Sequence, residues 1–301
     1  MKTNVLRRLL GVLALGALAF NLAAQAAPGS AKMSDRARDA LANNPNEWVN
    51  LIVTYKQRPN EQDWGRVVQA GGQVRHEFGI IDGHAITVPT QAAEALQGNP
   101  NVALVSLDEP LGAASTTSLP SPVGHTYPEI FNLPYTGMDV GVAVIDSGVK
   151  DHPDLKPDIK VSFLDKTEDK YGHGNHVSGI IAGDGDHSDG PYRGIAPDVF
   201  LVNLRVLDDL GQGFTSDVIA ALDWVLANKD QYNIRVANLS LGHPVYQPAA
   251  EDPLVQAVEA VWDAGVVVVA SAGNAGRDGY GTITSPGNSR KIITVGSITT
   301  W

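Results

Sequence analysis

Apolar and polar residues alternate in a short segment near residue 50, which indicates an extended strand. In EWVNLIVTYK, Val49, Leu51, Val53 and Tyr55 share one face of an extended chain. The next segment, NEQDWGRVVQAGG, has apolar residues at helical spacing and ends at a glycine pair, which is typical of a helix C-terminus. The sequence therefore predicts a strand followed by a helix.

Four further elements complete this small unit. QVRHEF and HAITVP are predicted as strands on either side of a turn at Asp82-Gly83. Thr90 and Gly98 bound the predicted helix QAAEALQ, and NVALVSL supplies the last strand. The order βαββαβ predicts a small α+β, ferredoxin-like domain over residues 47–108.

Beyond residue 138, continuous apolar runs replace the alternating pattern. VGVAVID, VFLVNLRVL, RVANLSL, GVVVVASA and KIITVGSI are typical of strands buried on both faces. Apolar helical stripes separate some of these runs, as in residues 218–226 and 254–262. The alternation predicts an α/β domain over residues 123–301, with a parallel sheet covered by helices on both faces and its active site at the carboxyl ends of the strands.

Two segments are predicted to lie outside these domains. Residues 109–122, which include GAASTTSLPSP, have no apolar periodicity and are predicted as an exposed linker open to proteolysis. Residues 1–26 combine three basic residues, an apolar run and a small-residue site, which predicts an export signal peptide. A membrane anchor is the alternative, but it needs about 20 continuous apolar residues.

Charge and cysteine content narrow the functional classes. The net charge is −11, and removing residues 1–26 with their three basic residues makes it −14. Such an acidic protein is not expected to bind nucleic acid. The chain has no cysteine, which excludes disulfides and thiol catalysis.

Asp146 and His173 are the candidates for proton chemistry. Asp146 ends a buried strand, where its carboxylate could cap a turn, bind a cation or orient a histidine. His173 lies between two glycines that leave room for a substrate, whereas His176 is expected to pack in the core. A zinc site through both histidines is an alternative, but the spacing lacks the usual i, i+4 pair and a third ligand.

Two later strand ends carry candidate binding groups. The backbone of Ser240, Leu241 and Gly242 could pair with an extended peptide, or form an ordinary turn. The side-chain amide of Asn274 could donate a hydrogen bond to an oxyanion, although a Gly-Asn pair is also common in turns.

The motifs VAVIDSGV, HPDL, GHGNHVSGIIAG, RGIAPDVFLVNLRVL, NLSLG, ASAGN and SPGNSRKIITVGS occur in the order found in subtilisin-like serine proteases. The sequence resembles a precursor of that family, with residues 47–108 as its inhibitory propeptide. The resemblance implies that Asp146 orients His173, that His173 is the general base and that Asn274 is the oxyanion donor. It also implies that residues 240–242 bind substrate and that Ser271, Ala272 and Gly273 line the specificity pocket.

The family's serine nucleophile follows the oxyanion asparagine by several tens of residues, and no such segment occurs before Trp301. The resemblance therefore implies an exported serine endopeptidase precursor whose serine lies beyond the given chain, and we expect residues 1–301 alone to be inactive. The alternative is a non-catalytic fragment whose propeptide-like domain binds and inhibits a protease.

The resemblance also implies partners and location. Expected partners are protein or peptide substrates and the chain's own propeptide, with no membrane association after signal removal; a secreted or periplasmic monomer is expected. No cofactor is required, but calcium is a possible structural ion. Asp154 matches a calcium-binding position in some family members, and Asp184, Asp186 and Asp189 lie in one acidic loop, which could equally be a solvated surface.

Overall fold

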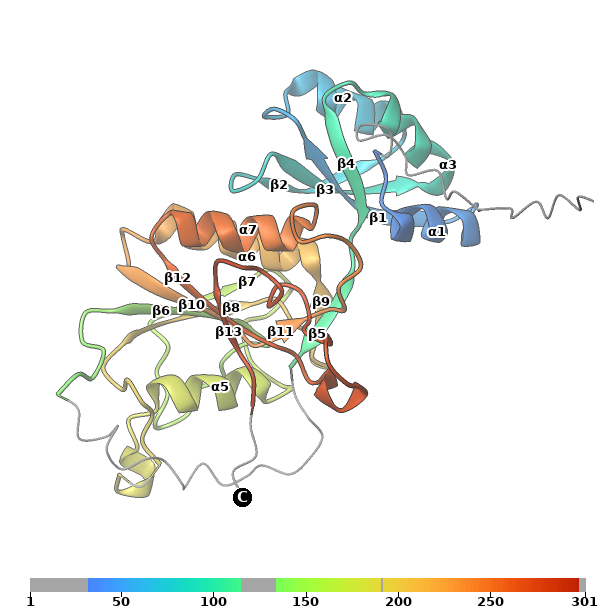
Figure 1. Ribbon diagram of the computed structural model, residues 1–301. Helices are drawn as coiled ribbons and strands as arrows, with labels where there is room; N and C mark the ends of the chain where they lie inside the picture. The colour runs from blue at the N-terminus through green and yellow to red at the C-terminus, as the bar shows by residue number, and fades with distance from the viewer. Residues whose placement is uncertain (1–31, 115–133, 191, 298–301) are drawn as a thin grey trace, which may run out of the picture. The chain divides into compact units, whose positions relative to one another are not determined.

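The computed structural model describes residues 32–114, 134–190 and 192–297 (Figure 1). Its larger sheet has six strands in the order β13-β12-β10-β6-β8-β7. The strands are β6 (Gly141–Asp146), β7 (Ile159–Ser162), β8 (Phe200–Arg205), β10 (Ile234–Leu239), β12 (Val267–Ser271) and β13 (Ile293–Val295). Every pairing within it is parallel, which confirms the predicted α/β fold class.

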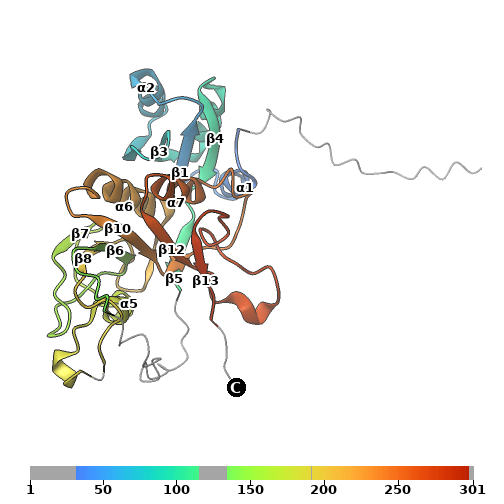
Figure 2. The same cartoon turned by 60° about the vertical axis from the view of Figure 1, so that its left-hand side comes forward.

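Helices cover both faces of this sheet. Helices α6 (Thr215–Asn228) and α7 (Pro253–Asp263) lie on one face, and α5 (His173–Ala182) lies on the other (Figures 1 and 2). Successive β6 residues separate accordingly: Ala143 and Ile145 join the core under α6 and α7, whereas Val142 and Val144 join the core that contains Ala182. Strands buried on both faces explain the continuous apolar runs in the sequence.

A second, antiparallel sheet has four strands in the order β2-β3-β1-β4. Its strands are β1 (Trp48–Tyr55), β2 (Gln73–Phe78), β3 (Gly83–Pro89) and β4 (Val102–Leu107). The associated helices are α1 (Asp35–Asn43), α2 (Glu61–Gln69), α3 (Thr90–Ala93) and the 3₁₀ helix η1 (Glu94–Gly98). The predicted order of six elements is observed, and α1 is an additional helix capped by the Ser34 side chain.

The small sheet has an apolar core on each face. Leu51 and Val53 pack with residues of α1 and α2, whereas Ile52 and Phe78 join the core that includes α6. The alternation within β1 therefore serves two cores, one inside the small unit and one shared with the larger sheet. In the described residues, no helix is long and apolar enough to span a bilayer.

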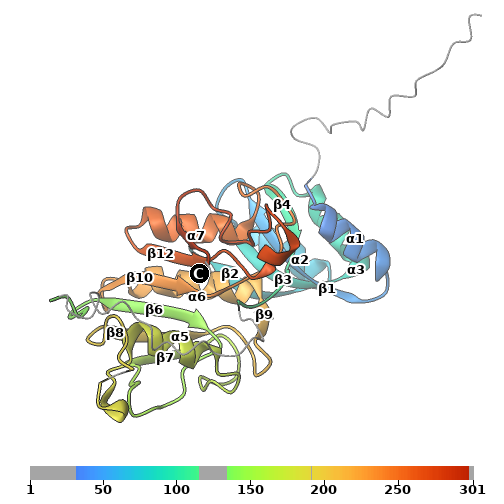
Figure 3. The same ribbon diagram turned by 60° about the horizontal axis from the view of Figure 1, so that its bottom comes forward.

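Three short strands form a third sheet in the order β11-β5-β9. They are β5 (Pro110–Ala113), β9 (Gln212–Phe214) and β11 (Leu241–Gly242), and both pairings are antiparallel. This sheet lies beside the carboxyl end of β6, close to the start of α5 (Figures 1 and 3). The remaining 3₁₀ helices are η2 (Asp186–Ser188) and η3 (Ala275–Asp278).

Candidate active site

Asp146 lies at the carboxyl end of β6 with its side chain fully buried. Its Oδ1 accepts hydrogen bonds from the backbone N–H of Ser147 at 2.7 Å and from His173 Nδ1 at 2.7 Å. Oδ2 has no hydrogen-bond partner in the described part of the chain. Burying a carboxylate is costly unless polar groups bind it. For Asp146 these groups are the Ser147 N–H and the His173 ring.

His173 is the first residue of α5, and its side chain is 10% exposed. Burial lowers its pKa, but the hydrogen bond and the charge of Asp146 outweigh that effect, with smaller contributions from Asp169 and the backbone of Ala114. The net pKa is raised above the ordinary value of 6.5. With Nδ1–H donating to Asp146, Nε2 is the nitrogen that can accept a proton.

His176 does not take part in this arrangement. Its side chain is exposed, so the expectation that it packs in the core is wrong. Helix α5 places its apolar residues Val177 and Ile181 against the sheet and leaves His176 outside that face. Among the described residues, no three histidine, aspartate or glutamate side chains form a group that could hold a metal ion.

The segment before residue 115 is a strand and not an exposed linker. β5 lies between β9 and β11, with Gly112 opposite Gly242 and Leu111 opposite Gly213. Leu111 is 4% exposed and joins the main core. The prediction of an exposed linker is therefore wrong for residues 110–113, because one buried leucine among small residues leaves no periodic signal; residues 115–122 lie outside the described residues.

The next residue, Ala114, brings this strand to His173. Its N–H donates to the carbonyl of Ser240 at 2.8 Å, and the N–H of Ala113 donates to the carbonyl of Gly211 at 2.9 Å. The Ala114 backbone also lies close enough to His173 to raise the pKa of the imidazole. The structure thus brings Asp146, His173 and the predicted binding segment 240–242 together around one extended peptide.

Ser271 is the last residue of β12, and Ala272 and Gly273 follow it. Ala272 N–H donates to Val295 O at 2.8 Å, and Ala272 O accepts from Thr284 N–H at 3.2 Å. Gly273 has a positive φ of 85°, and a Cβ there would lie 2.7 Å from the Thr284 side chain. The segment is therefore held in a conformation that requires glycine.

Asn274 follows this segment, and its side chain is exposed at the start of η3. The parallel register of β10 and β12 puts Ser271 at the same sheet edge as Leu239. In the described part of the chain, the side-chain hydrogen bonds of Asp146 and His173 do not include Asn274. Its oxyanion role remains a prediction.

The small sheet contacts the domain that carries this site through buried polar groups. Asp108 is 2% exposed, pairs with Arg75 and accepts hydrogen bonds from Ser216 N–H at 2.9 Å and Oγ at 2.8 Å. Burial raises the pKa of Asp108, although Arg75 opposes that effect. His76 Nε2 lies 3.0 Å from Asp217 Oδ1 in the same region.

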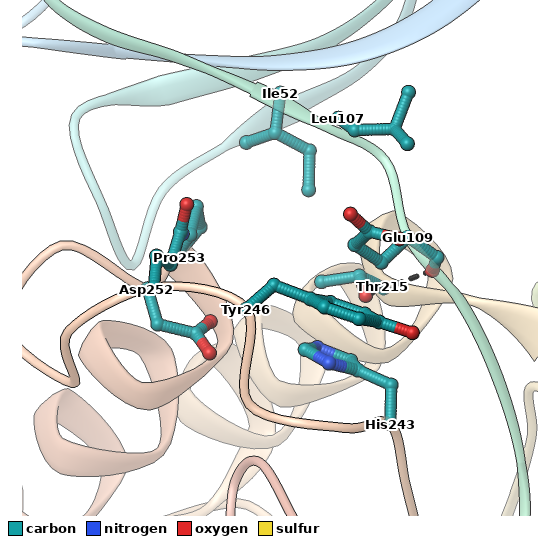
Figure 4. Close-up of a pocket in the computed structure, with 9 residues that line it drawn as sticks. Ile52, Leu107, Glu109, Thr215, His243, Tyr246, Asp252 and Pro253 are labelled. Atoms are coloured by element: carbon teal, nitrogen blue, oxygen red, sulfur yellow. Dashed lines mark hydrogen bonds between the residues drawn. The ribbon is translucent and has the colours of Figure 1, made fainter. Parts of the chain in front are cut away.

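A second group of contacts surrounds Glu109, just before β5, and Figure 4 shows Glu109 with Thr215, Tyr246 and His243 from this group. Glu109 accepts two hydrogen bonds from Arg36, each 3.0 Å long, and its carbonyl accepts one from Thr215 Oγ1 at 3.0 Å. The Arg36 guanidinium lies 4.4 Å above the Tyr246 ring, which in turn stacks on His243. These contacts attach Glu109, the residue directly before β5, to α1 through Arg36 and to α6 through Thr215.

Comparison with known proteins places these features in a family. A family model described as the subtilase family matches residues 137–300. Serine protease AprX of Bacillus subtilis is 44% identical over 54% of this chain and 39% of its own length. Subtilisin E of the same species is 33% identical over 82% of this chain and 65% of its own length. The chain thus spans less than two thirds of each relative.

A solved structure gives the same picture for the fold. The crystal structure of fervidolysin from Fervidobacterium pennivorans, described as a keratinolytic enzyme related to subtilisin, superposes with a TM-score of 0.64 at 20% identity. The superposition covers 83% of this chain and 43% of the fervidolysin chain. Because the family model extends over both the strand that ends at Asp146 and the helix that begins at His173, this chain belongs to the subtilase family of serine proteases.

Proposed function

We propose that this chain is the N-terminal part of an exported serine endopeptidase precursor. In this proposal Asp146 orients His173, and His173 accepts the proton of a serine hydroxyl that attacks a peptide carbonyl. The serine is predicted outside residues 1–301, and Asn274 is the proposed oxyanion donor. The 2.7 Å contact between Asp146 Oδ1 and His173 Nδ1 is the observation that carries the proposal.

The position of β5 supports a propeptide role for residues 47–108. A substrate that binds by strand addition forms main-chain hydrogen bonds with the strands beside it. β5 forms such bonds with β9 and β11. The residue directly after it, Ala114, lies beside His173. Residues 110–114 therefore occupy the place proposed for a peptide substrate, with the small domain attached directly before them.

We infer a processing site from this arrangement. Ala114 is the residue whose N–H binds Ser240 O and whose backbone contacts His173, so its carbonyl carbon is the expected point of attack. We expect cleavage between Ala114 and Ser115 in protein that also carries the serine. Mass spectrometry of the mature protein should give Ser115 as the first residue, and His173→Ala should leave the precursor uncleaved.

Two outcomes would contradict this expectation. A mature N-terminus within residues 123–301 would place the cleaved bond outside the strand that reaches His173. Processing that continues at the same rate in the His173→Ala variant would show that another protease cuts the chain. The variant Tyr192→Ala, which changes an exposed side chain, serves as the control and should be processed normally.

The alternative of a non-catalytic inhibitor rests on the small domain. Its contacts through Asp108, His76 and Glu109 support binding to a subtilase catalytic domain. We favour intramolecular inhibition, because β5 connects the small domain to the site within the same chain. Covalent continuity keeps the effective concentration of such a strand high.

Calcium binding and export are expectations from the sequence. Asp184 Oδ1 accepts the N–H of Asp186, and Asp154 Oδ1 accepts the N–H of His187. These oxygens stabilise turns, and no cluster of three such residues is found in the described ranges. We therefore assign no step to calcium and base export on the N-terminal sequence alone.

A further inference from the structure

Asp169 has a buried carboxylate near His173, and no motif in the sequence points to a role for Asp169. It lies in the loop between β7 and α5 and is 4% exposed. Oδ1 accepts the N–H of Gly172 at 2.7 Å, and Oδ2 accepts the N–H of Asn175 at 2.8 Å. None of the ion pairs among the described residues includes Asp169, so these hydrogen bonds offset the cost of burying its charge.

Ser147 links this carboxylate to the one at the end of β6. Its hydroxyl donates to Asp169 Oδ1 at 3.0 Å, while its backbone N–H donates to Asp146 Oδ1 at 2.7 Å. The same hydroxyl accepts the N–H of Gly174 at 2.9 Å. A single fully buried serine therefore connects Asp146, Asp169 and the start of α5.

These contacts fix the backbone on both sides of the imidazole. The N–H groups of Gly172, Gly174 and Asn175 are all bound by Asp169 or Ser147, and they surround His173 in the sequence. A Cβ at Gly174 would lie 2.1 Å from the carbonyl oxygen of Gly148, so the helix start is packed tightly against the turn after β6. The first turn of α5 has little room to shift.

Arg205 fixes the other end of the same loop. Its side chain is 2% exposed, and Nη1 donates to the carbonyl of Glu168 at 2.6 Å, while Nε donates to Leu207 O at 3.0 Å. Arg205 lies directly opposite Asp146 in the pairing of β6 and β8. The residue before Asp169 is thus attached to the strand beside the one that carries Asp146.

We propose that Asp169 is a positioning residue for His173, which holds the first turn of α5 so that Nδ1 stays on the Asp146 carboxylate. Its importance for catalysis rests on the proposed role of His173 as a base, but its effect on the ring can be measured without catalysis. A misplacement of about 1 Å costs on the order of a hundred-fold in rate, so such a residue matters although it does not touch substrate.

The charges around the ring agree with this role. The groups facing His173 are the carboxylates of Asp146 and Asp169, the backbone of Ala114 and the ring of Tyr171, whose centroid is 6.4 Å away. Burial lowers the pKa of His173, and both carboxylates raise it. Removing the charge of Asp169 therefore acts in the same direction as loosening the contact with Asp146.

The test is nuclear magnetic resonance of the histidine rings in the 301-residue chain. In the unmodified chain we expect a protected Nδ1 proton on His173 and a pKa above the ordinary value. Asp169→Asn keeps the size of the side chain but removes its charge. It should speed exchange of that proton roughly tenfold, as for the loss of one charge-assisted hydrogen bond, and lower the pKa of His173.

Two further variants separate positioning from general stability. Ser147→Ala removes only the linking hydroxyl and should change both readouts in the same direction by less, which covers the case in which Asp169→Asn does not fold. Asp252→Ala removes another buried aspartate that caps a helix, α7, and should lower the melting temperature without changing His173.

The outcomes distinguish this inference from the proposed function. If Asp169→Asn and Ser147→Ala lower the melting temperature but leave the Nδ1 proton and the titration of His173 unchanged, Asp169 is only structural and the inference is overturned. If the unmodified chain shows no Nδ1 proton shared with Asp146, the proposed function is contradicted together with it.

Discussion

His173→Ala should lower kcat for peptide hydrolysis by about a million-fold in protein that carries the expected serine, which is the loss known for the equivalent change in subtilisin. In the proposed mechanism His173 accepts the serine proton through Nε2, because Nδ1 is bound to Asp146. Asp146→Asn should cost about ten thousand-fold, because an amide favours the wrong tautomer of the imidazole. Steady-state kinetics with a chromogenic peptide measure both losses.

The matched control is Asp151→Asn, which neutralises an exposed aspartate five residues after Asp146. It should leave kcat within a factor of about two, since exposed ion pairs contribute little. A comparable loss in Asp151→Asn, or a loss of less than about tenfold in His173→Ala, would contradict the assigned roles.

Acidification should destabilise the small sheet through His84. This side chain on β3 is fully buried, its Nδ1 lies 3.2 Å from Tyr55 Oη, and its Nε2 has no hydrogen-bond partner in the described part of the chain. Burial lowers the pKa of His84 to about 4, and nearby Arg58 also lowers it, while Asp63 opposes the change.

The direction of the pH effect follows from these values. Because the folded pKa lies below the unfolded value near 6.5, protons bind the unfolded state more readily. The stability due to neutral His84 is complete above about pH 7 and declines as the pH falls from about 6.5 to 4. The loss at pH 4 is about 3 kcal/mol.

Hydrogen exchange of the β1 and β3 amides measures this loss at pH 4 and pH 7. His84→Leu should remove most of the additional acid sensitivity, although it also removes the partner of Tyr55 and lowers stability at pH 7. His187→Leu, which changes an exposed histidine, should keep the acid sensitivity of the unmodified protein. Equal acid sensitivity in the His84→Leu variant would show that other groups cause it.

Most of the strands and helices could be predicted from the sequence because they bury regularly spaced apolar residues. The alternation in β1 and the continuous apolar runs of β6, β8 and β12 are confirmed as strands. Since parallel strands end at one edge of a sheet, Asp146 could also be expected near a residue at the start of a following helix. The observed contact with His173 agrees with that expectation.

The features that the sequence did not reveal depend on contacts between distant segments. β5 forms between β9 and β11, more than ninety residues away along the chain, and only Leu111 among its residues is strongly apolar. Arg205 can be buried because the carbonyl groups of Glu168, in the loop before α5, and of Leu207 accept its N–H groups. Asp169 precedes His173 by four residues, a spacing that suggests a helix cap but not its bond to Ser147.

Covalent labelling with a fluorophosphonate tests the central claim most directly, because the reagent reacts with a serine only when a neighbouring base activates it. Protein extended beyond residue 301 should be labelled on one serine outside residues 1–301, and labelling should be lost in His173→Ala and strongly reduced in Asp146→Asn. Labelling that persists in His173→Ala, or that falls on Ser240 or Ser271, would contradict an active site built on Asp146 and His173.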